Sequence, residues 1–159
     1  MEFRPMRRHK QELPLETCIQ ILKKEPRGVL SVLGEGDYPY GMPVNHYYCP
    51  ENGRIYFHTA KAGHRLDAIR AHDKVSLCVY DQGYRWEGEW ALNISSVIVF
   101  GRIRVVEDQA HALEMIRGLA RKFTDDEGYI QHEIETAAKH VLCLELTPEH
   151  ITGKLVNES

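Results

Sequence analysis

The sequence predicts a mainly β protein with added helices, arranged as an antiparallel barrel. Five or six strand patterns follow one another, and tight-turn signals of the hairpin type join several of them. Helical patterns are inserted between some of the strands. Hairpin order with inserted helices favours an antiparallel sheet that curls toward closure. The chain has 159 residues and shows no repeat or linker, so we expect a single domain over residues 1–159.

The expected elements can be placed from periodicity and turn chemistry. Helices are predicted over residues 15–24, 63–72, 108–120 and 129–139. Strands are predicted over residues 28–33, 38–48, 54–59, 74–81, 93–106 and 140–146, the last ending at Thr147-Pro148. Pro39 and Pro43 lie inside the second strand, which favours a sheet edge, a bulge or a bend there.

The segment 93–106 is the longest strand candidate, and its centre is apolar on both faces. One face carries Ile94, Ile98 and Phe100, and the other carries Val97, Val99 and Gly101. A strand of a small monomeric barrel is expected to be polar on its solvent side. The second apolar face therefore predicts a homodimer, with coverage by the flanking helices as the alternative.

Composition excludes several classes of function. The net charge is -3 and the charged content is 27%, which is not typical of a general nucleic-acid binder. No apolar run has membrane-spanning length and the N-terminus lacks a signal-peptide pattern, so we expect a cytoplasmic protein. The four cysteines form no CxxC pair, and the nine histidines show no HxxxH or HExxH pattern. We therefore expect neither a disulfide framework nor a metal site.

The most informative segment is 55–67, where a strand passes through a short turn into a helix. A helix start carries unpaired backbone N–H groups and partial positive charge. Lys61 and Arg65 are four residues apart and add two positive charges there, with His58 and Thr59 at the strand end. This pattern is typical of a phosphate site, although basic residues at a helix start are also commonly just solvated.

Five segments, taken together, give the chain a family resemblance. They are Met6-Arg7-Arg8, the run 38–45 (YPYGMPVN), the runs 55–60 and 63–67 (IYFHTA and GHRLD), the run 95–101 (SSVIVFG), and Thr152-Gly153-Lys154. In this order they resemble the FMN-binding split-barrel proteins related to pyridoxamine 5′-phosphate oxidase, in particular the nitroimidazole-resistance branch. The resemblance spans nearly the whole chain and implies an antiparallel split β-barrel that binds FMN between two subunits of a homodimer.

The resemblance also implies roles for particular residues. The strand Met42, Pro43, Val44 and Asn45 would lie along the isoalloxazine ring, and His58 and Thr59 near the ribityl chain and phosphate. Phosphate binding would fall to Lys61, His64 and Arg65. The second subunit would contribute Ser95 and Ser96, and Lys154 would lie close to the site. Relatives often carry lysine where Arg65 stands, but arginine can also clamp a phosphate.

These residues predict an FMN-dependent oxidoreductase that passes electrons from NAD(P)H through flavin to a small organic acceptor, of the nitroimidazole type or similar. No GxGxxG motif follows a strand, so the nicotinamide is expected as a transient donor. His58 and Tyr47 are candidate proton donors, with cofactor orientation as the alternative role of His58. Trp86 and Trp90 are expected to roof the acceptor pocket or to pack in the core or the dimer contact. The alternative function is a non-catalytic flavin- or haem-binding protein of the same fold.

Overall fold

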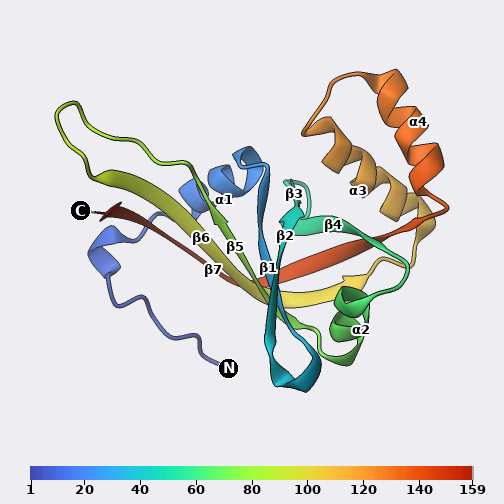
Figure 1. The fold of residues 1–159 in the computed structure, drawn as a ribbon, viewed down its shortest axis with the longest axis horizontal. Helices are drawn as coiled ribbons and strands as arrows, with labels where there is room; N and C mark the ends of the chain where they lie inside the picture. Colours follow the sequence, from blue (N-terminus) through green and yellow to red (C-terminus); the bar gives the residue numbers. More distant parts are fainter. Residues whose placement is uncertain (159) are drawn as a thin grey trace.

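The computed structural model of the chain, which describes residues 1–158, consists of one curled seven-stranded sheet with four α-helices (Figure 1). The strands are β1 (Arg27–Leu33), β2 (Pro39–Asn45), β3 (Tyr47–Cys49), β4 (Arg54–Ala60), β5 (Lys74–Tyr80), β6 (Leu92–Val105) and β7 (Val141–Glu158). The helices are α1 (Leu15–Lys24), α2 (His64–Ala71), α3 (Gln109–Arg121) and α4 (Glu127–Ala137), with short 3-10 turns η1 (His9–Gln11) and η2 (Glu35–Asp37).

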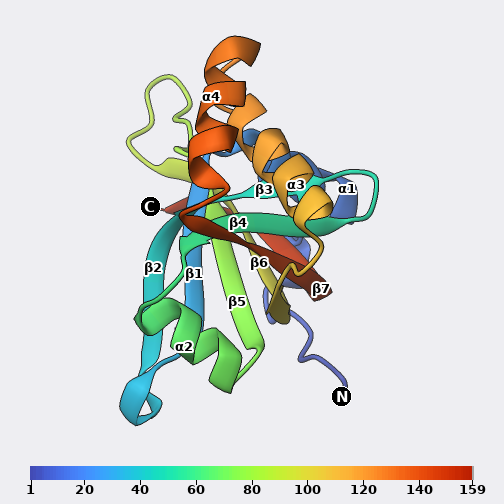
Figure 2. The same cartoon turned by 90° about the vertical axis from the view of Figure 1, so that its right-hand side faces the viewer.

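The sheet is a half-barrel with the strand order β2-β1-β5-β6-β7-β4-β3. Every neighbouring pair is antiparallel. The end strands β2 and β3 follow each other in sequence, yet they lie at opposite ends of the strand order, so the barrel is split between them (Figure 2). The predicted mainly β, antiparallel split-barrel architecture with α additions is therefore confirmed.

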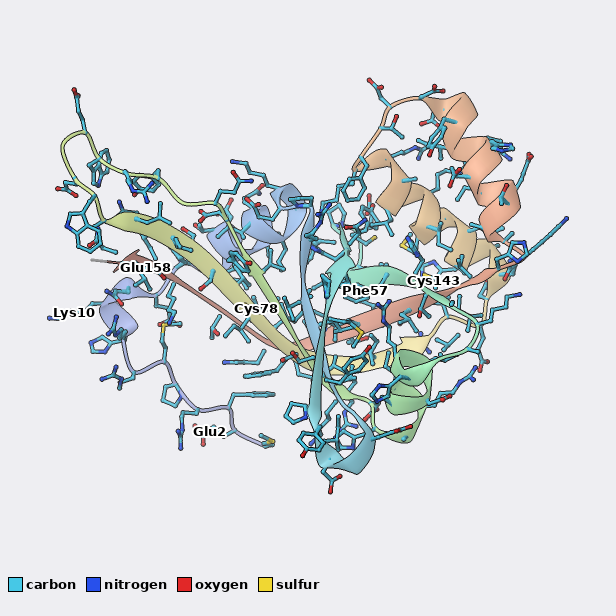
Figure 3. The ribbon with its side chains drawn as sticks, in the orientation of Figure 1. Glu2, Lys10, Phe57, Cys78, Cys143 and Glu158 are labelled. Carbon is cyan, nitrogen blue, oxygen red and sulfur yellow. The ribbon has the colours of Figure 1, made fainter. Side chains whose placement is uncertain are left out.

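Two separate cores stabilise the fold. The first lies within the curl of the sheet and includes Leu30, Phe57, Leu77 and Leu144, with Leu22 of α1 packed among them. The second lies between α3 and α4 and the opposite side of β3, β4 and β7; its members include Tyr56, Met115, Ile130 and Cys143. Figure 3 shows Phe57 of the first core and Cys143 of the second on the neighbouring strands β4 and β7. Burial on both faces explains why β4 reads as a nearly continuous apolar run.

The end of the last strand was predicted wrongly. β7 does not stop at Thr147-Pro148 but continues to Glu158 and pairs with β6 from Leu92 onward. The register shifts between Phe100 and Gly101, where His150 and then Pro148 are the partners, so Glu149 is an extra residue in a bulge. A proline is tolerated at such a position because the ladder is interrupted there.

The predicted strand 38–48 is also interrupted. The ladder of β2 ends at Asn45, and β3 begins at Tyr47. Between them His46 is fully buried, with its Nε2 2.8 Å from the carbonyl oxygen of Leu22 in α1. Burial, followed by the charge of Lys122, lowers the pKa of His46 to about 4, so the ring is neutral at physiological pH. The expectation that the prolines mark an edge is confirmed, because β2 is the first strand in the sheet order.

The two faces of β6 differ in burial. Val97, Val99 and Gly101 are buried in the first core, whereas Ile98 and Phe100 on the other face are 38% and 42% exposed. Helical cover of this face is the alternative to a dimer, and the aromatic contacts of Phe100 come from elsewhere in the chain. The stacking partners of its ring are Phe3 of the N-terminal segment and His150, with ring centroids 6.0 and 6.3 Å away.

A buried ionic network anchors α3 to the sheet. Glu145 of β7 is fully buried, accepts a hydrogen bond from the Tyr56 hydroxyl at 2.8 Å, and pairs with Arg104 of β6 at 2.8 Å. His111 of α3 lies 3.1 Å from the same hydroxyl. Burial alone would raise the pKa of Glu145, but these hydrogen bonds and the charges of Arg104 and Arg54 lower it on balance. The carboxylate is thus kept ionised in a buried position, which holds the first turn of α3 against β4 and β7.

The bulge at Gly101 gives a test of the fold. A Cβ at this residue would collide with the backbone carbonyl of Thr147, whereas a Cβ at Gly41 of β2 would meet only ordinary contacts at 3.4 Å. We expect Gly101→Ala to lower the free energy of urea-induced unfolding by roughly 1–3 kcal/mol because the backbone cannot yield cheaply. Gly41→Ala is the matched control and should change it by less than about 0.5 kcal/mol. Equal effects of the two substitutions would contradict the close β6–β7 approach.

Candidate functional site

The candidate site is built where β4 leads into α2. Thr59 is buried at the end of β4, Lys61 is exposed in the turn, and Arg65 is half-buried in the first turn of α2. Gly63 is the N-cap residue and has φ = 129°, a conformation that L side chains rarely adopt. The glycine therefore allows the sharp entry into α2, whose first backbone N–H groups have no acceptor within the helix.

The charge at this turn is uncompensated. Within residues 1–158, neither Lys61 nor Arg65 forms an ion pair with a carboxylate. Arg65 instead donates from Nε to Met42 Sδ at 2.8 Å, which joins the turn to β2. Two cations, a threonine hydroxyl and a helix start are donors that suit a phosphate dianion.

His64 has a different environment from the other residues of the turn. Its ring stacks on Tyr40 of β2 with centroids 4.2 Å apart, and its Nε2 accepts a hydrogen bond from the Glu35 backbone N–H at 3.3 Å. These contacts connect α2 to the β1–β2 hairpin. Its role in phosphate binding stays a prediction.

Alternate side chains of β2, the strand predicted to bind the flavin ring, lie on opposite sides of the sheet. Met42 and Val44 point into the first core and are buried, while Pro43 and Asn45 are exposed on the other side of β2. Since β2 is an edge strand, the backbone N–H and C=O groups on its outer side form no hydrogen bonds with another strand of the sheet. Such groups can form hydrogen bonds with the polar edge of a bound ring, and the role of β2 in ring binding stays a prediction.

His58 and Asn45 meet at a cavity of about 500 Å³ beside the turn. His58 is exposed on the side of β4 that faces α3 and α4. Most of the remaining wall comes from these two helices, including Leu119, Phe123 and Ile134. Part of the His58 side chain stays exposed, but the surrounding groups remove enough of its water to lower its pKa, and the positive charge of Arg65 lowers it further, so the ring is neutral near pH 7.

The other predicted residues lie elsewhere on the same chain. Ser96 pairs with Lys154 across β6 and β7, and both line a small cavity of about 200 Å³ with Arg4 and Ile98. The backbone of Ser95 is bonded to the Asp81 carboxylate at 3.0 Å. Thr59 pairs with Leu142, twelve residues before Lys154 in β7, or roughly 40 Å of extended strand. One chain therefore does not bring Lys154 to the cationic turn along this strand.

Several remaining candidates can be placed as well. Tyr47 lines a different cavity from His58, together with Lys23 and Lys122. Trp86 and Trp90 are 60% and 74% exposed in a loop that projects from the end of the sheet (Figure 1, upper left). A core role for the two tryptophans is therefore wrong. In the part of the chain that the structure describes, no group of three or more histidine, cysteine or acidic side chains could hold a metal ion.

The helical wall of the cavity was missed by the sequence reasoning. Both helices were predicted, but nothing local showed that they fold back over β4 to face His58. The sequence signal for this wall was the apolar stripe of α3, which includes Ile116, Leu119 and Ala120. The stripe is wider than contact with a single strand would bury. No helix among residues 1–158 is both long and apolar enough to cross a membrane.

The curled antiparallel sheet, split between β2 and β3 and carrying a cationic turn before α2, defines a split-barrel protein. The family described as pyridoxamine 5′-phosphate oxidase matches residues 14–155, and the chain belongs to this family. A comparison with curated proteins found no match.

Solved structures agree with this assignment. A candidate 5-nitroimidazole antibiotic resistance protein from Bacteroides thetaiotaomicron has a TM-score of 0.80 and 15% identity, covering 92% of this chain and 87% of that one. A FAD-binding protein from Mesorhizobium loti has a TM-score of 0.66 and 20% identity, covering 92% and 97%. The flavocytochrome Anf3 from Azotobacter vinelandii has a TM-score of 0.76 and 22% identity, covering 96% and 72%. At these identities the similarity shows the fold alone.

The environment of His58 gives a test that needs no ligand. Replacing Arg65 by glutamine removes a neighbouring positive charge, so the pKa of His58 should rise. It should stay below the ordinary histidine value, because burial is the larger cause of the shift. Histidine proton resonances followed by NMR across pH 5–8 would measure both changes. Arg70→Gln, at the far end of α2, is the control, and an equal rise there would contradict the local interaction.

Proposed function

We propose that this protein is an FMN-dependent oxidoreductase whose flavin phosphate binds at the turn between β4 and α2. The observation that carries the proposal is the unpaired charge of Lys61 and Arg65 beside Thr59 and the start of α2. Family membership and the flavin-binding proteins among the similar structures support it. The names of those similar structures specify FAD rather than FMN, so the identity of the nucleotide needs direct measurement.

The chain offers a place for each part of the cofactor. Lys61 and Arg65, with His64 beside them, would hold the phosphate, while Thr59 and His58 would contact the ribityl chain. The ring would lie along the backbone of β2 from Met42 to Asn45, where edge groups remain available. Arg65 bridges the two regions through its contact with Met42. The phosphate turn and the ring strand are thus mechanically connected.

The proposal includes a homodimer with each flavin at the seam. The exposed side chains of Ile98 and Phe100 form the apolar face that a partner would bury. Ser95, Ser96 and Lys154 of one subunit would then complete the site of the other. This arrangement accounts for the distance along β7 between Lys154 and the cationic turn in a single chain.

When bound, the flavin would supply the redox chemistry, taking a hydride from NAD(P)H and reducing a small organic acceptor, of the nitroimidazole type or similar. The protein contributes binding and orientation. His58 is the polar side chain best placed to orient the acceptor or donate a proton, because it lines the cavity beside the turn. The similarity to a candidate nitroimidazole resistance protein supports this class of acceptor.

A second function has an observation in its favour. Similar structures include a flavocytochrome and a FAD and heme binding protein from Mycobacterium smegmatis, so the same fold serves proteins that bind haem as well. A non-catalytic carrier of flavin or haem would purify coloured but stay oxidised with NADH or NADPH under anaerobic conditions. Bleaching of the flavin spectrum by either nucleotide would support the oxidoreductase.

The phosphate assignment predicts the behaviour of the double variant Lys61→Gln/Arg65→Gln. Removing two charge-assisted contacts should weaken FMN binding on the order of a hundredfold or more, leaving the purified protein colourless. Visible absorption, chromatography of heat-released flavin and FMN titration measure the change, and circular dichroism checks the fold. Arg70→Gln/Lys74→Gln removes two exposed charges from the other end of the same segment and should keep the flavin. Unchanged flavin content in the first variant would contradict the assignment.

The dimer makes a separate prediction. Phe100→Glu places a charge on the exposed face of β6, where burial against a partner would be unfavourable. We expect a shift from dimer to monomer in sedimentation or size-exclusion measurements, accompanied by weaker flavin retention. Leu15→Glu introduces the same charge at an exposed apolar residue of α1, away from β6, and serves as the control. A wild-type protein that is monomeric at micromolar concentration would refute the shared site.

A further inference from the structure

The residues that line the cavity beside His58 indicate which chemical class of ligand it can bind. It lies on the side of β4 and β7 that faces away from the first core, and α3 and α4 cover it. Its volume of about 500 Å³ falls within the range of small-molecule sites. Its apolar wall comes from both helices, with Ile116, Leu119 and Phe123 on one side and Ile134 on the other.

The charges around this cavity are unlike those of the turn. Within the described residues 1–158, no lysine or arginine lines it, and Glu133 is its single carboxylate. The polar groups that remain are two histidines, His58 and His140, and uncharged side chains such as Asn45 and Thr124. An anion entering the cavity would lose its hydration beside the carboxylate of Glu133 without gaining a lysine or arginine partner, which is unfavourable. A neutral molecule would lose little hydration and gain the apolar contacts.

We propose that this cavity, between α3 and α4 and next to His58, binds the electron acceptor, and that the acceptor is an uncharged aromatic compound. The inference rests on the proposed function, because it assigns a place and a chemical class to the acceptor of the flavin. His58 is shared by the two regions: it lines the cavity and lies within the electrostatic influence of Arg65 in the cationic turn. Asn45, the last residue of the strand proposed to lie along the isoalloxazine ring, also lines the cavity, so an acceptor bound there would lie beside the redox-active part of the cofactor.

The exposed aromatic side chains at α3 and α4 fit this assignment. Phe123 and Tyr129 line the cavity and remain 47% and 56% exposed. Flat apolar surfaces at an entrance favour stacking with an aromatic ligand over an aliphatic one. The cavity thus discriminates by charge through its walls and by shape through these two rings.

The test uses equilibrium dialysis of the purified protein with two probes of similar size, nitrobenzene and 4-nitrobenzoate, with and without added FMN. Nitrobenzene should bind at least tenfold more tightly than the carboxylate, because only the carboxylate must be buried as an anion. Equal affinities would overturn the proposal.

Two variants locate the binding. Ala120→Phe fills the cavity from α3 and Ala137→Leu fills it from α4, and each should weaken nitrobenzene binding at least tenfold with unchanged flavin content. Ala110→Phe, an exposed position of α3 outside the cavity, is the matched control and should bind as wild type. If Ala120→Phe fails to fold, Ala137→Leu decides the question. Unchanged nitrobenzene binding in the filled variants would overturn the proposal.

The outcomes separate this inference from the proposed function. Loss of flavin in the cavity-filling variants would show that the cavity holds the isoalloxazine ring, which would overturn the acceptor assignment while sparing the flavoprotein. A wild-type protein that takes up no FMN would refute the oxidoreductase and with it the acceptor role. Selective, cavity-dependent nitrobenzene binding beside bound FMN supports both.

Discussion

The whole architecture depends on the pairing of β7 with two different strands. Its first residues pair with β4, and from Leu144 onward it also pairs with β6 as far as Glu158. β7 therefore joins the half of the sheet that carries His58 and Thr59 to the half that carries the exposed apolar face. Because both ladders share Leu144 to Leu146, the two halves cannot change their relative position without breaking hydrogen bonds in the middle of the sheet.

The buried carboxylate of Glu145 lies in this shared stretch of β7 and also connects the sheet to α3. Its contacts reach Arg104 on β6, Tyr56 on β4 and, through that hydroxyl, His111 on α3. A charge without partners at this depth would be strongly destabilising, so the network favours the position in which the first turn of α3 packs against the sheet. The direction of α3 then determines which of its side chains face β4. The contacts of His111 with Tyr56 and Glu145 thus help to position the later residues of α3 that line the cavity.

Much of the fold could be predicted because its signals are local. The long strand β6, the turn chemistry before β4 and the aspartate cap of α3 each depend on a few adjacent residues, and the structure confirms them. The end of β7 could not be predicted in this way. Pro148 has the local signature of a strand end, and only the partner strand shows that it falls in a bulge. His46 interrupts a strand for a similarly distant reason, its contact with α1.

The candidate site also has one part that local sequence predicts and one part that it does not. The cationic turn is a contiguous segment, so Thr59, Lys61 and Arg65 lie within seven residues of one another at the end of β4 and the start of α2. The facing wall of α3 and α4 lies more than fifty residues away in the chain, and no short motif links it to His58. Sequence could place the helices but not their orientation, which depends on the buried charges described above.

The stack of His64 on Tyr40 has an evolutionary consequence. It couples the start of α2 to the tip of an exposed hairpin, where substitutions are generally tolerated. Residues of that hairpin can alter how rigidly the turn is held before any ligand arrives, and rigidity beforehand reduces the entropy lost on association. Substitutions in a surface loop can therefore change how rigidly the turn between β4 and α2 is held while every side chain of the turn itself stays the same.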